Sequence, residues 1–441
     1  MQSTPFIGRK AEQQILREAL QSTEAEMVAV IGRRRVGKTF LVKTTYRENL
    51  AFDITGIQNG ELRIQLARFR DRLIDYTQSD LTIPVPEDWF AAFQLLKEYL
   101  EMLPAGQKRV LFFDELPWLA THRSNFLSAF GYFWNSWASE QALVVVICGS
   151  AASWMIRRVV NNTGGLYNRI TRRIFLQPFT LAETATYFQS RNVSFNTYQI
   201  AQLYMAMGGI PHYLKEVKAG KSAAQNIDAI CFAQNGLLWD EFPRLYPSLF
   251  NNADKHIAVI EALAQKQSGL TRQEIVKRSK LSDGGGLTTV LEELSHSGFI
   301  TPYTSFGQKK HNKIYRLTDE YSLFYLKFIE NHQAEGATIW QHLSQTQIYK
   351  SWSGYAFENL CLKHLPAIKK ALGIAGIYST ASSFYKKGTD QRQGTQIDLV
   401  IDRNDQVINL FEIKFYNRAI SLTQKDAAQL RQKMWRFQDL T

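Results

Sequence analysis

Residues 32–39, GRRRVGKT, carry two glycines, a lysine and a threonine at the spacing G-x-x-x-x-G-K-[ST]. Glycines let the backbone wrap a polyphosphate with its N–H groups pointing inward, and a helix that starts at the loop adds a favourable dipole. In such a loop Lys38 faces the β- and γ-phosphates and the Thr39 hydroxyl binds Mg²⁺. The alternative, a solvated or nucleic-acid-binding arginine patch, is disfavoured by the flanks: a strand-like apolar run precedes the loop and a helical pattern follows it. The residues predicted to contact a nucleotide here are Gly32, Arg35, Val36, Gly37, Lys38, Thr39 and Phe40.

A phosphate loop needs a second metal-supporting carboxylate at the end of a neighbouring buried strand. The segment KRVLFFDELPWL supplies one, with a strand over 110–113 followed by Asp114 and Glu115. We expect Asp114 to hold Mg²⁺ and Glu115 to polarise the attacking water. A third strand, LVVVICGS, ends in Ser150, which either contacts the γ-phosphate or the attacking water, or closes a turn.

A second group of charged residues lies near the C-terminus. The segment TQIDLVIDRNDQVINLFEIKF predicts a hairpin that turns near residue 405 and brings Asp398 opposite Glu412. Strand alternation separates Asp398 from Ile397, Leu399 and Ile401, and puts Glu412 and Lys414 on one face. The preceding helix, SGYAFENLCLKHL, carries Glu358. Two carboxylates and a lysine on one side of a sheet suit a Mg²⁺ site. The alternative is a hairpin with ordinary surface charges.

The elements that position these residues change character along the chain. The first 180 residues predict a parallel sheet with helices on both faces, and 181–250 predict a helical lid. From about 251 to 328, three short amphipathic helices precede two strand-like runs joined by the basic turn FGQKKHNK. That order resembles a winged helix-turn-helix. The segment NHQAEGATIW is the predicted linker to the last part of the chain.

The winged-helix pattern has two interpretations. In the first, the third helix, beginning near Leu287, reads DNA while Lys309 and Lys310 of the wing contact phosphates. In the second, the module contacts protein, because Glu292 and Glu293 on the same helix would repel a DNA backbone that they faced.

Composition bounds the remaining possibilities. The 441 residues suggest about three domains, and 52 Lys and Arg against 40 Asp and Glu give a net charge of +12. This excess fits a polyanionic partner such as DNA, or simply a basic soluble protein. Three distant cysteines exclude a disulfide framework. With no signal-like N-terminus and no membrane-length apolar run, we expect a cytoplasmic protein with no membrane partner.

Several segments, taken in order, make the chain resemble the AAA+-related P-loop ATPases of the archaeal type, near the signal-transducing ATPases with a Gly-x-Pro lid motif. They are FIGRKAEQQIL, the phosphate loop, LFFDE, CGSAASWM, GGLYNRITRRIFLQPFT and GGIPHYL. The resemblance implies that Gly8 and Arg9 lie near the adenine pocket and that Arg169 acts at the γ-phosphate. It also implies a lid element over the nucleotide at Gly209-Ile210-Pro211 with His212, although a histidine such as His212 is more often structural than catalytic. From the residues alone, Arg169, Arg172 and Arg173 form a basic cluster that could be a solvated loop or a DNA patch.

The C-terminal segment resembles the PD-(D/E)xK nuclease-like core. Asp398 matches the aspartate of that motif, Glu412-Ile413-Lys414 its E-x-K, and Glu358 the acidic residue of the preceding helix. Two features depart from the pattern: no proline precedes Asp398, and little chain follows the helix TQKDAAQLRQKMWRFQ. A nuclease-like fold that does not cleave is therefore the alternative to an active one.

Together these observations predict an α/β P-loop NTPase core (1–180), a helical lid (181–250), a winged helix (251–330) and a nuclease-like domain (345–441). The predicted function is an ATP-binding and ATP-hydrolysing switch, coupled to the winged helix and the nuclease-like domain, that acts on DNA. Its expected ligands are ATP, ADP and Mg²⁺, with a homo-oligomer as one assembly. The alternative is a regulatory ATPase whose C-terminal domains bind nucleic acid or protein without cleavage.

Overall fold

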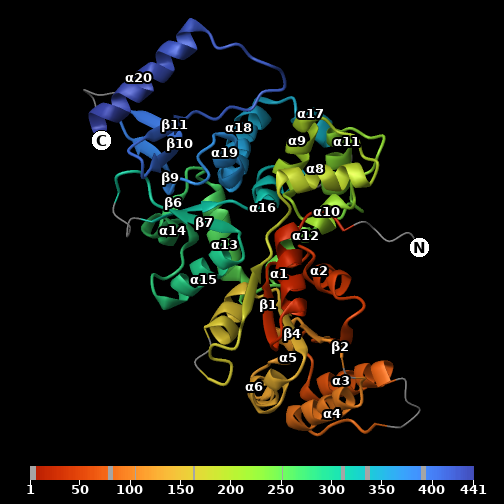
Figure 1. Cartoon of the computed structure of the whole chain (residues 1–441). Helices are drawn as coiled ribbons and strands as arrows, with labels where there is room; N and C mark the ends of the chain where they lie inside the picture. The colour runs from red at the N-terminus through yellow and green to blue at the C-terminus, as the bar shows by residue number, and fades with distance from the viewer. Residues whose placement is uncertain are drawn as a thin grey trace. The chain divides into compact units, whose positions relative to one another are not determined.

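The computed structural model describes residues 6–77, 83–104, 106–161, 164–250, 252–308, 313–332, 338–388 and 394–441. The chain divides into two compact units, Met1–Pro178 and Phe179–Thr441. The first unit holds one sheet and the second unit holds two (Figure 1).

The first unit is built on a five-stranded parallel sheet with the order β2-β3-β4-β1-β5. Its strands are β1 (Glu26–Ile31), β2 (Leu50–Thr55), β3 (Arg109–Asp114), β4 (Leu143–Gly149) and β5 (Arg172–Phe175). Every residue of β1 and β4 is buried, as expected for central strands rich in valine and isoleucine. The predicted strands at 27–31, 110–113 and LVVVICGS are confirmed.

Helices cover both faces of this sheet because its strands alternate their side chains between two apolar layers. Met27, Ala29 and Ile31 of β1 join the core that α3, α4 and α6 close, whereas α1 and α2 pack on the other face against β1 and β4. The helices of this unit are α1 (Lys10–Gln21), α2 (Lys38–Thr45), α3 (Leu62–Thr77), α4 (Trp89–Glu101), α5 (Leu116–Leu119), α6 (Phe126–Ser136) and α7 (Ala152–Met155). Two short turns complete them, η1 (Ala138–Glu140) and the π-helical η2 (Ile156–Val160).

The second unit begins with helices throughout the predicted lid. They are α8 (Leu181–Ser190), α9 (Thr197–Met207), α10 (Pro211–Leu214), α11 (Ala223–Ile227), the π-helical η3 (Asp228–Phe232) and α12 (Glu241–Leu245). The prediction of a helical segment over 181–250 is confirmed.

Three helices and a small antiparallel sheet follow. The helices are α13 (Ala253–Ala264), α14 (Arg272–Ser279) and α15 (Gly285–His296), and the strands are β6 (Leu270–Thr271), β7 (Ile300–Tyr303) and β8 (Ile314–Leu317) in the order β6-β8-β7. The predicted order of three helices and two strands is present, with β6 added and α15 starting two residues before Leu287. Glu293 does not face solvent freely, because its carboxylate contacts the buried His256 at 2.9 Å. Lys309 and Lys310 lie outside the described residues.

The predicted linker is wrong at its C-terminal end. Trp340 is almost fully buried, its backbone N–H donates to Asp228 at 2.7 Å, and its ring packs among Phe324, Phe328 and Trp352. A buried tryptophan contributes strongly to the stability of a core. The polar residues beside Trp340 in the sequence do not indicate that it is buried. The surrounding helices are α16 (Glu320–Phe324), the π-helical η4 (Tyr325–Ile329), α17 (Ile339–Leu343), α18 (Gln347–Lys363) and α19 (Leu365–Ala371).

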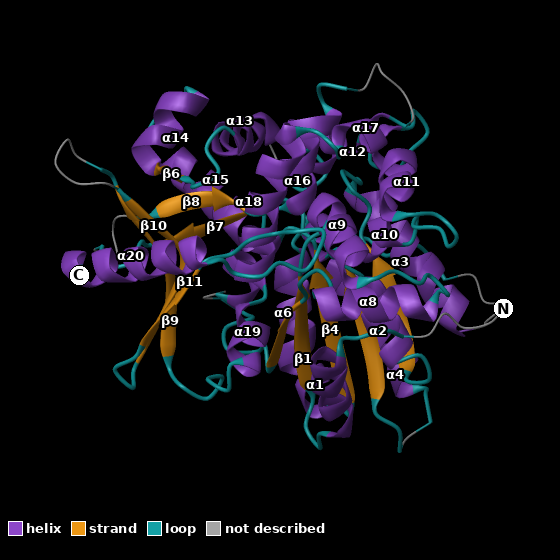
Figure 2. Ribbon diagram, turned by 90° about the horizontal axis from the view of Figure 1, so that it is seen from above, coloured by secondary structure: helices purple, strands orange, loops and turns teal. Residues whose placement is uncertain are grey.

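The chain ends in a three-stranded antiparallel sheet, β11-β10-β9, beside a long helix (Figure 2). The elements are β9 (Ser379–Lys386), β10 (Thr395–Arg403), β11 (Ile408–Phe411) and α20 (Gln424–Leu440). The β10–β11 hairpin turns as predicted, with Leu399 opposite Phe411 and Val400 opposite Leu410.

A β-bulge in β10 makes the predicted alternation wrong. The register with β9 shifts between Ile397 and Val400, so that two residues oppose one. Ile397 and Val400 therefore pack on the same side, with Phe437 of α20. Leu399 and Ile401 pack in a separate cluster with Ile374.

Candidate nucleotide site and carboxylate cluster

The glycine loop leaves the carboxyl end of β1 and enters α2 at Lys38. Gly37 has φ of +94°, a left-handed conformation that residues with a Cβ rarely adopt. At Gly32, an added Cβ would lie 2.4 Å from the carbonyl oxygen of Leu176, whose N–H donates to Ile31 at 2.7 Å. Gly37 is therefore required by its backbone conformation, and Gly32 by the lack of space for a Cβ.

The lysine and threonine of the loop lie where the motif predicts. Lys38 is buried, and its ammonium donates to the carbonyl of Arg33 at 3.0 Å. The Thr39 hydroxyl donates to Asp114 Oδ2 at 2.6 Å, which joins the start of α2 to the end of β3. A hydroxyl beside a carboxylate is a hard oxygen donor set of the kind Mg²⁺ prefers, so these residues fit that ion.

Glu115 and Ser150 also come together. The backbone N–H and the hydroxyl of Ser150 both donate to Glu115 Oε2, at 3.1 and 2.8 Å. Glu115 has φ of +48°, and its N–H donates to Asp114 Oδ1 at 3.0 Å. Adjacent residues at the end of β3 thus face different partners: Asp114 faces the loop threonine and Glu115 faces the end of β4.

The N-terminal segment borders the loop. Arg9 is buried and directs a guanidinium nitrogen to the carbonyl of Val36 at 3.4 Å, while Gly8 just before it has φ of +68°. The rings of Phe6 and Phe40 stack 5.5 Å apart, and Phe40 is half exposed. Arg35 is exposed on the loop, with φ of +69°. Gly8, Arg9 and Phe40 therefore lie on the same side of the first unit as the phosphate loop.

Sequence reasoning missed three residues at this edge. The Arg34 guanidinium lies 5.3 Å from the Trp118 ring centre, so one of the three arginines is held by a cation–π contact. Gln65 is buried and donates to the carbonyls of Ile57 and Trp118. Cys148, on β4, is buried close to Asp114, and burial raises the pKa of its thiol well above the ordinary value. Arg34 and Cys148 lie within quoted motifs and Gln65 lies outside them, but no local pattern indicates the contacts that these three residues make.

Arg169 is not brought to the phosphate loop. It lines a cavity of about 470 Å³ with residues that precede β1, β4 and β5, including Ala25, Ala142 and Thr171. That cavity is at the amino edge of the sheet, whereas the loop leaves the carboxyl edge. A strand the length of β1 separates the edges by about 20 Å. The prediction that Arg169 reaches the γ-phosphate is therefore not met within one chain, because β5 runs parallel to β1 and the residues before it lie at the far end.

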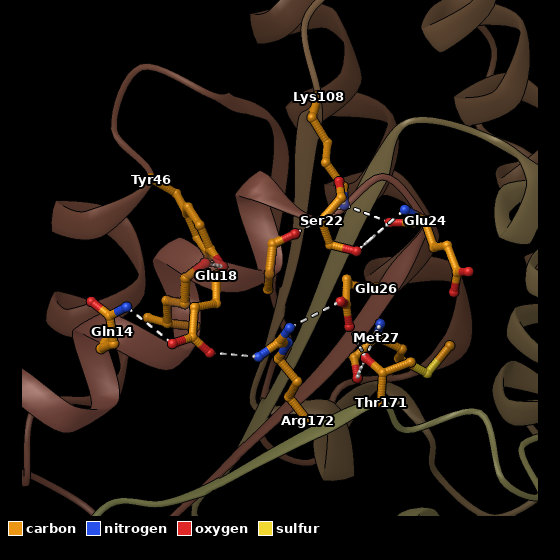
Figure 3. Close-up of polar contacts among 12 residues, drawn as sticks. Gln14, Glu18, Ser22, Glu24, Glu26, Met27, Tyr46, Lys108, Thr171 and Arg172 are labelled. Carbon is orange, nitrogen blue, oxygen red and sulfur yellow. Dashed lines mark hydrogen bonds and ion pairs between the residues drawn. The ribbon is translucent and has the colours of Figure 1, made fainter.

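Arg172 has a structural role at the same edge. Figure 3 shows it between α1 and β1, with its guanidinium 3.0 Å from Glu18 and 3.3 Å from Glu26. Burial alone would raise the pKa of Glu26, but hydrogen bonds from Thr171 and Arg172 hold it below its usual value. Since Arg172 is committed to two carboxylates, the basic patch predicted from Arg169, Arg172 and Arg173 is smaller than the sequence indicates.

Pro211 opens α10 in the second unit, where its fixed φ suits the first helical turn. Its contact with nucleotide stays a prediction.

The C-terminal carboxylates face different partners. Glu412 accepts from Lys414 and from Lys433 of α20, each at 2.6 Å. These two bonds hold the pKa of Glu412 below its usual value, although burial opposes them. Asp398 Oδ2 accepts from the N–H of Ile413 at 2.9 Å. The Asp398 side chain therefore accepts a backbone N–H just beyond the end of β11.

Glu358 is buried on α18 and paired with Arg316 of β8 at 2.6 Å. Burial raises the pKa of Glu358, and the charge of nearby Asp398 adds to this, while Arg316 opposes both. Asp398 is thus near α18, whereas Glu412 is directed to α20. Across the described parts of the chain, no three His, Cys, Asp or Glu side chains gather as metal ligands. The predicted Mg²⁺ pair, Asp398 and Glu412 with Glu358 and Lys414 nearby, stays a prediction. Lys414 contacts Glu412 at 2.6 Å, and although burial opposes them, Glu412 and the charge of Asp398 both raise the pKa of Lys414.

Comparison with known proteins decides the nature of the first half. Residues 6–217 match a protein family described as an ATPase domain predominantly from Archaea. Residues 6–217 are therefore similar to ATPase domains of the archaeal type, and we call them the ATPase domain. A Walker-type ATPase of Pyrococcus abyssi is similar in structure, with a TM-score of 0.53 and 18% identity over 73% of this chain and 96% of that one. Its likeness shows that the ATPase domain has the fold of a P-loop ATPase.

Similarity in sequence extends beyond the ATPase domain. An uncharacterised protein of Methanocaldococcus jannaschii is 24% identical over 418 residues, which are 93% of this chain and 87% of that protein. The described helices include none long and apolar enough to cross a membrane.

Proposed function

We propose that the ATPase domain binds and hydrolyses ATP in the loop between β1 and α2. The observation that carries this proposal is the Thr39–Asp114 contact of 2.6 Å, next to the Glu115–Ser150 pair. These contacts support the proposal because they bring a threonine hydroxyl and two carboxylates together at one edge of the sheet.

In this proposal each residue has one task. When ATP binds, the Lys38 ammonium leaves the carbonyl of Arg33 and contacts the β- and γ-phosphates. The backbone N–H groups from Gly32 to Thr39 bind the phosphate chain. Glu115 accepts a proton from the attacking water, and Ser150 orients its carboxylate. Thr39 and Asp114 would hold Mg²⁺, which neutralises charge on the phosphates when it is bound. Gly8, Arg9 and Phe40 border the adenine of ATP, and Pro211 belongs to the lid.

The first test removes the loop cation. Lys38→Ala should abolish ATP binding or hydrolysis, because a buried ammonium no longer balances the phosphates. Binding of a fluorescent ATP analogue and phosphate release measure the two steps. Lys97→Ala is the control, since Lys97 is on α4, where it contacts Glu101 at 3.8 Å and lies 6.0 Å from the Trp137 ring centre. Wild-type affinity and turnover in Lys38→Ala would exclude the site.

We further propose that the ATPase domain controls a DNA-binding output in the second unit. The arrangement of α13, α14 and α15 before the β6-β8-β7 sheet supports a winged helix, and Lys277, Arg278 and Lys280 on or just after α14 add exposed positive charge. Glu293 is turned toward His256, which removes one of the two carboxylates that would repel DNA. Binding of a labelled duplex, measured with and without ATP over a salt series, tests this coupling.

The alternative, a regulatory ATPase that does not cleave DNA, has a specific observation in its favour. Glu412 is neutralised by Lys414 and Lys433, and Glu358 by Arg316, so two of the three acidic residues already have cationic partners. Incubation of supercoiled plasmid with the protein and Mg²⁺ or Mn²⁺ separates the two functions. Nicking that Asp398→Asn abolishes supports a nuclease, and duplex binding without nicking supports the regulatory protein.

We also propose that Arg169 acts on the nucleotide of a neighbouring copy in a homo-oligomer. Its place at the amino edge of the sheet supports this, because that edge is remote from the phosphate loop of the same chain.

A further inference from the structure

A groove of about 730 Å³ runs between the β11-β10-β9 sheet and α20, which lie side by side in Figures 1 and 2. We name it the β11–α20 groove. Its apolar lining includes Ile408, Leu410, Leu430, Met434 and Phe437. Only Phe437 of α20 is buried, while Leu430 and Met434 are 40% and 49% exposed. Strand and helix therefore present apolar side chains to a space that they do not fill.

The edge of the sheet beside this groove is open. Among the described strands, β11 pairs with β10 alone. The N–H of Arg403 donates to the carbonyl of Val407 at 3.0 Å, so these two residues form a hydrogen-bonded pair. Antiparallel ladders alternate hydrogen-bonded and non-hydrogen-bonded pairs. The next pairs are Asp402 with Ile408, Ile401 with Asn409, and Val400 with Leu410. Ile408 and Leu410 therefore point their N–H and C=O groups away from β10, toward the open edge.

The same two residues line the groove with their side chains. An extended chain that pairs with Ile408 and Leu410 would extend the sheet by one strand. Its alternate side chains would then lie over the groove, because strand side chains point to one face at every second residue. Backbone pairing and an apolar pocket at the same place indicate a polypeptide ligand rather than a small molecule.

The charge around the groove favours one class of polypeptide ligand over another. Arg431 of α20 is exposed at its rim, and Lys433 beside it holds Glu412. A second copy of this chain would bring two basic α20 helices together within a molecule of net charge +12. An acidic partner meets no such repulsion. We propose that the β11–α20 groove binds an extended, acidic segment of a partner protein, which adds as a strand to β11 and places alternate apolar side chains in the groove.

The test uses the full-length chain and a fluorescein-labelled peptide, Glu-Val-Glu-Leu-Glu-Val-Glu-Leu, with binding measured by anisotropy. Ile408→Pro removes the N–H of residue 408, which points to the open edge and makes no hydrogen bond with β10. This change should weaken peptide binding about tenfold, as expected for one or two lost hydrogen bonds. Met434→Glu should weaken it at least as much, because it places a like charge in the groove. Gln432→Glu is the matched control: it makes the same charge change on an exposed position of α20 outside the lining, and should leave the affinity within about threefold.

A ligand-side variant removes any dependence on folding. The same peptide with N-methyl groups on alternate residues cannot pair with the edge and should bind at least tenfold more weakly. Equal binding of the methylated peptide, or of a Lys-Val-Lys-Leu counterpart, would overturn the proposal. An oligo-dT strand that displaces the peptide and loses affinity in Met434→Glu would show that the groove takes nucleic acid instead. Dimerisation that Ile408→Pro abolishes would assign it to a second copy.

Discussion

Glu115 is the residue on which the proposed chemistry depends most directly. Its Oε2 accepts two hydrogen bonds from Ser150, and no lysine or arginine pairs with it in the described contacts. Glu115→Gln keeps the shape but cannot accept a proton, so hydrolysis should fall about 10²- to 10⁴-fold while ATP affinity is retained. Phosphate release under single-turnover conditions, with affinity from a fluorescent analogue, separates these effects.

Ser150→Ala provides the graded comparison. The backbone N–H of residue 150 still reaches Glu115 at 3.1 Å, so only the hydroxyl contact is lost. Its rate should therefore lie between those of the wild type and Glu115→Gln. If Glu115→Gln hydrolyses ATP at the wild-type rate, the base is another residue.

The sequence predicts single residues well where a motif fixes backbone and side chain together. Lys38 and Thr39 follow a glycine with a left-handed backbone, and Asp114 follows four buried apolar residues of β3, so their places were predictable. The Arg34–Trp118 contact and the Arg316–Glu358 pair were not, because each joins residues far apart in sequence. The position of Glu358 in its motif, for example, does not predict that Arg316 pairs with it.

At the scale of elements, a buried charge cluster joins the phosphate-loop helix to the edge of the sheet. Asp53 of β2 contacts Lys43 of α2 at 2.7 Å, and also Arg72 and Tyr76 of α3. Burial alone would raise the pKa of Asp53, but the bonds from Lys43 and Tyr76 keep it below its usual value. Asp53→Asn should lower the free energy of unfolding by about 3 kcal/mol, because it leaves partly buried cations without their counter-charge.

Urea denaturation of the ATPase domain within the full chain measures this loss. Asp71→Asn is the control, since Asp71 is half exposed and pairs with its neighbour Arg70. Its effect should stay within about 0.5 kcal/mol. Equal losses in the two variants would show that Asp53 contributes no more than a surface charge.

The Arg172–Glu26 contact makes the first unit sensitive to acid. The folded-state pKa of Glu26 is below its ordinary value, so the unfolded chain binds the proton more readily. The stability from this group is therefore present above the unfolded pKa, near 4.5, and is lost as pH falls through the folded value. Glu26→Gln should be less stable than the wild type at pH 7, and the difference should shrink below about pH 4.5. A difference that stays constant from pH 7 to 3 would contradict this linkage.

The order of the elements was predictable where periodicity is strong. The strands β1, β3 and β4, the helices of 181–250 and the β10–β11 hairpin all follow from apolar runs, helical spacing and a turn sequence. The bulge between Ile397 and Val400 was not predictable, because no glycine or proline marks it and Phe437, which packs with both residues, is distant in sequence. Trp340 likewise joins an aromatic core that assembles from distant helices. Tertiary packing overrides local pattern at both places.

For the whole molecule, the open question is whether one chain completes its own ATPase site. The loop carries Lys38, Thr39, Asp114 and Glu115 at the carboxyl edge of the sheet, but Arg169 lies beside a cavity at the amino edge. If Arg169 acts on a neighbouring copy, hydrolysis per chain should rise with protein concentration, because only an assembled pair brings the two edges together. Arg169→Ala should slow hydrolysis about 10³-fold while leaving ATP affinity nearly unchanged.

Mixing two inactive variants provides the decisive measurement. Lys38→Ala lacks a working loop but keeps its arginine, and Arg169→Ala keeps the loop but lacks the arginine. Within a mixed oligomer the arginine of the first can face the loop of the second, so hydrolysis should return in the mixture although each variant alone is inactive. The restored rate should peak near an equal ratio of the two chains. The proposal fails if the mixture is as inactive as its components and the wild-type rate per chain does not depend on concentration. Arg169 would then not act between copies, and it would be part of a basic surface at the amino edge of the sheet.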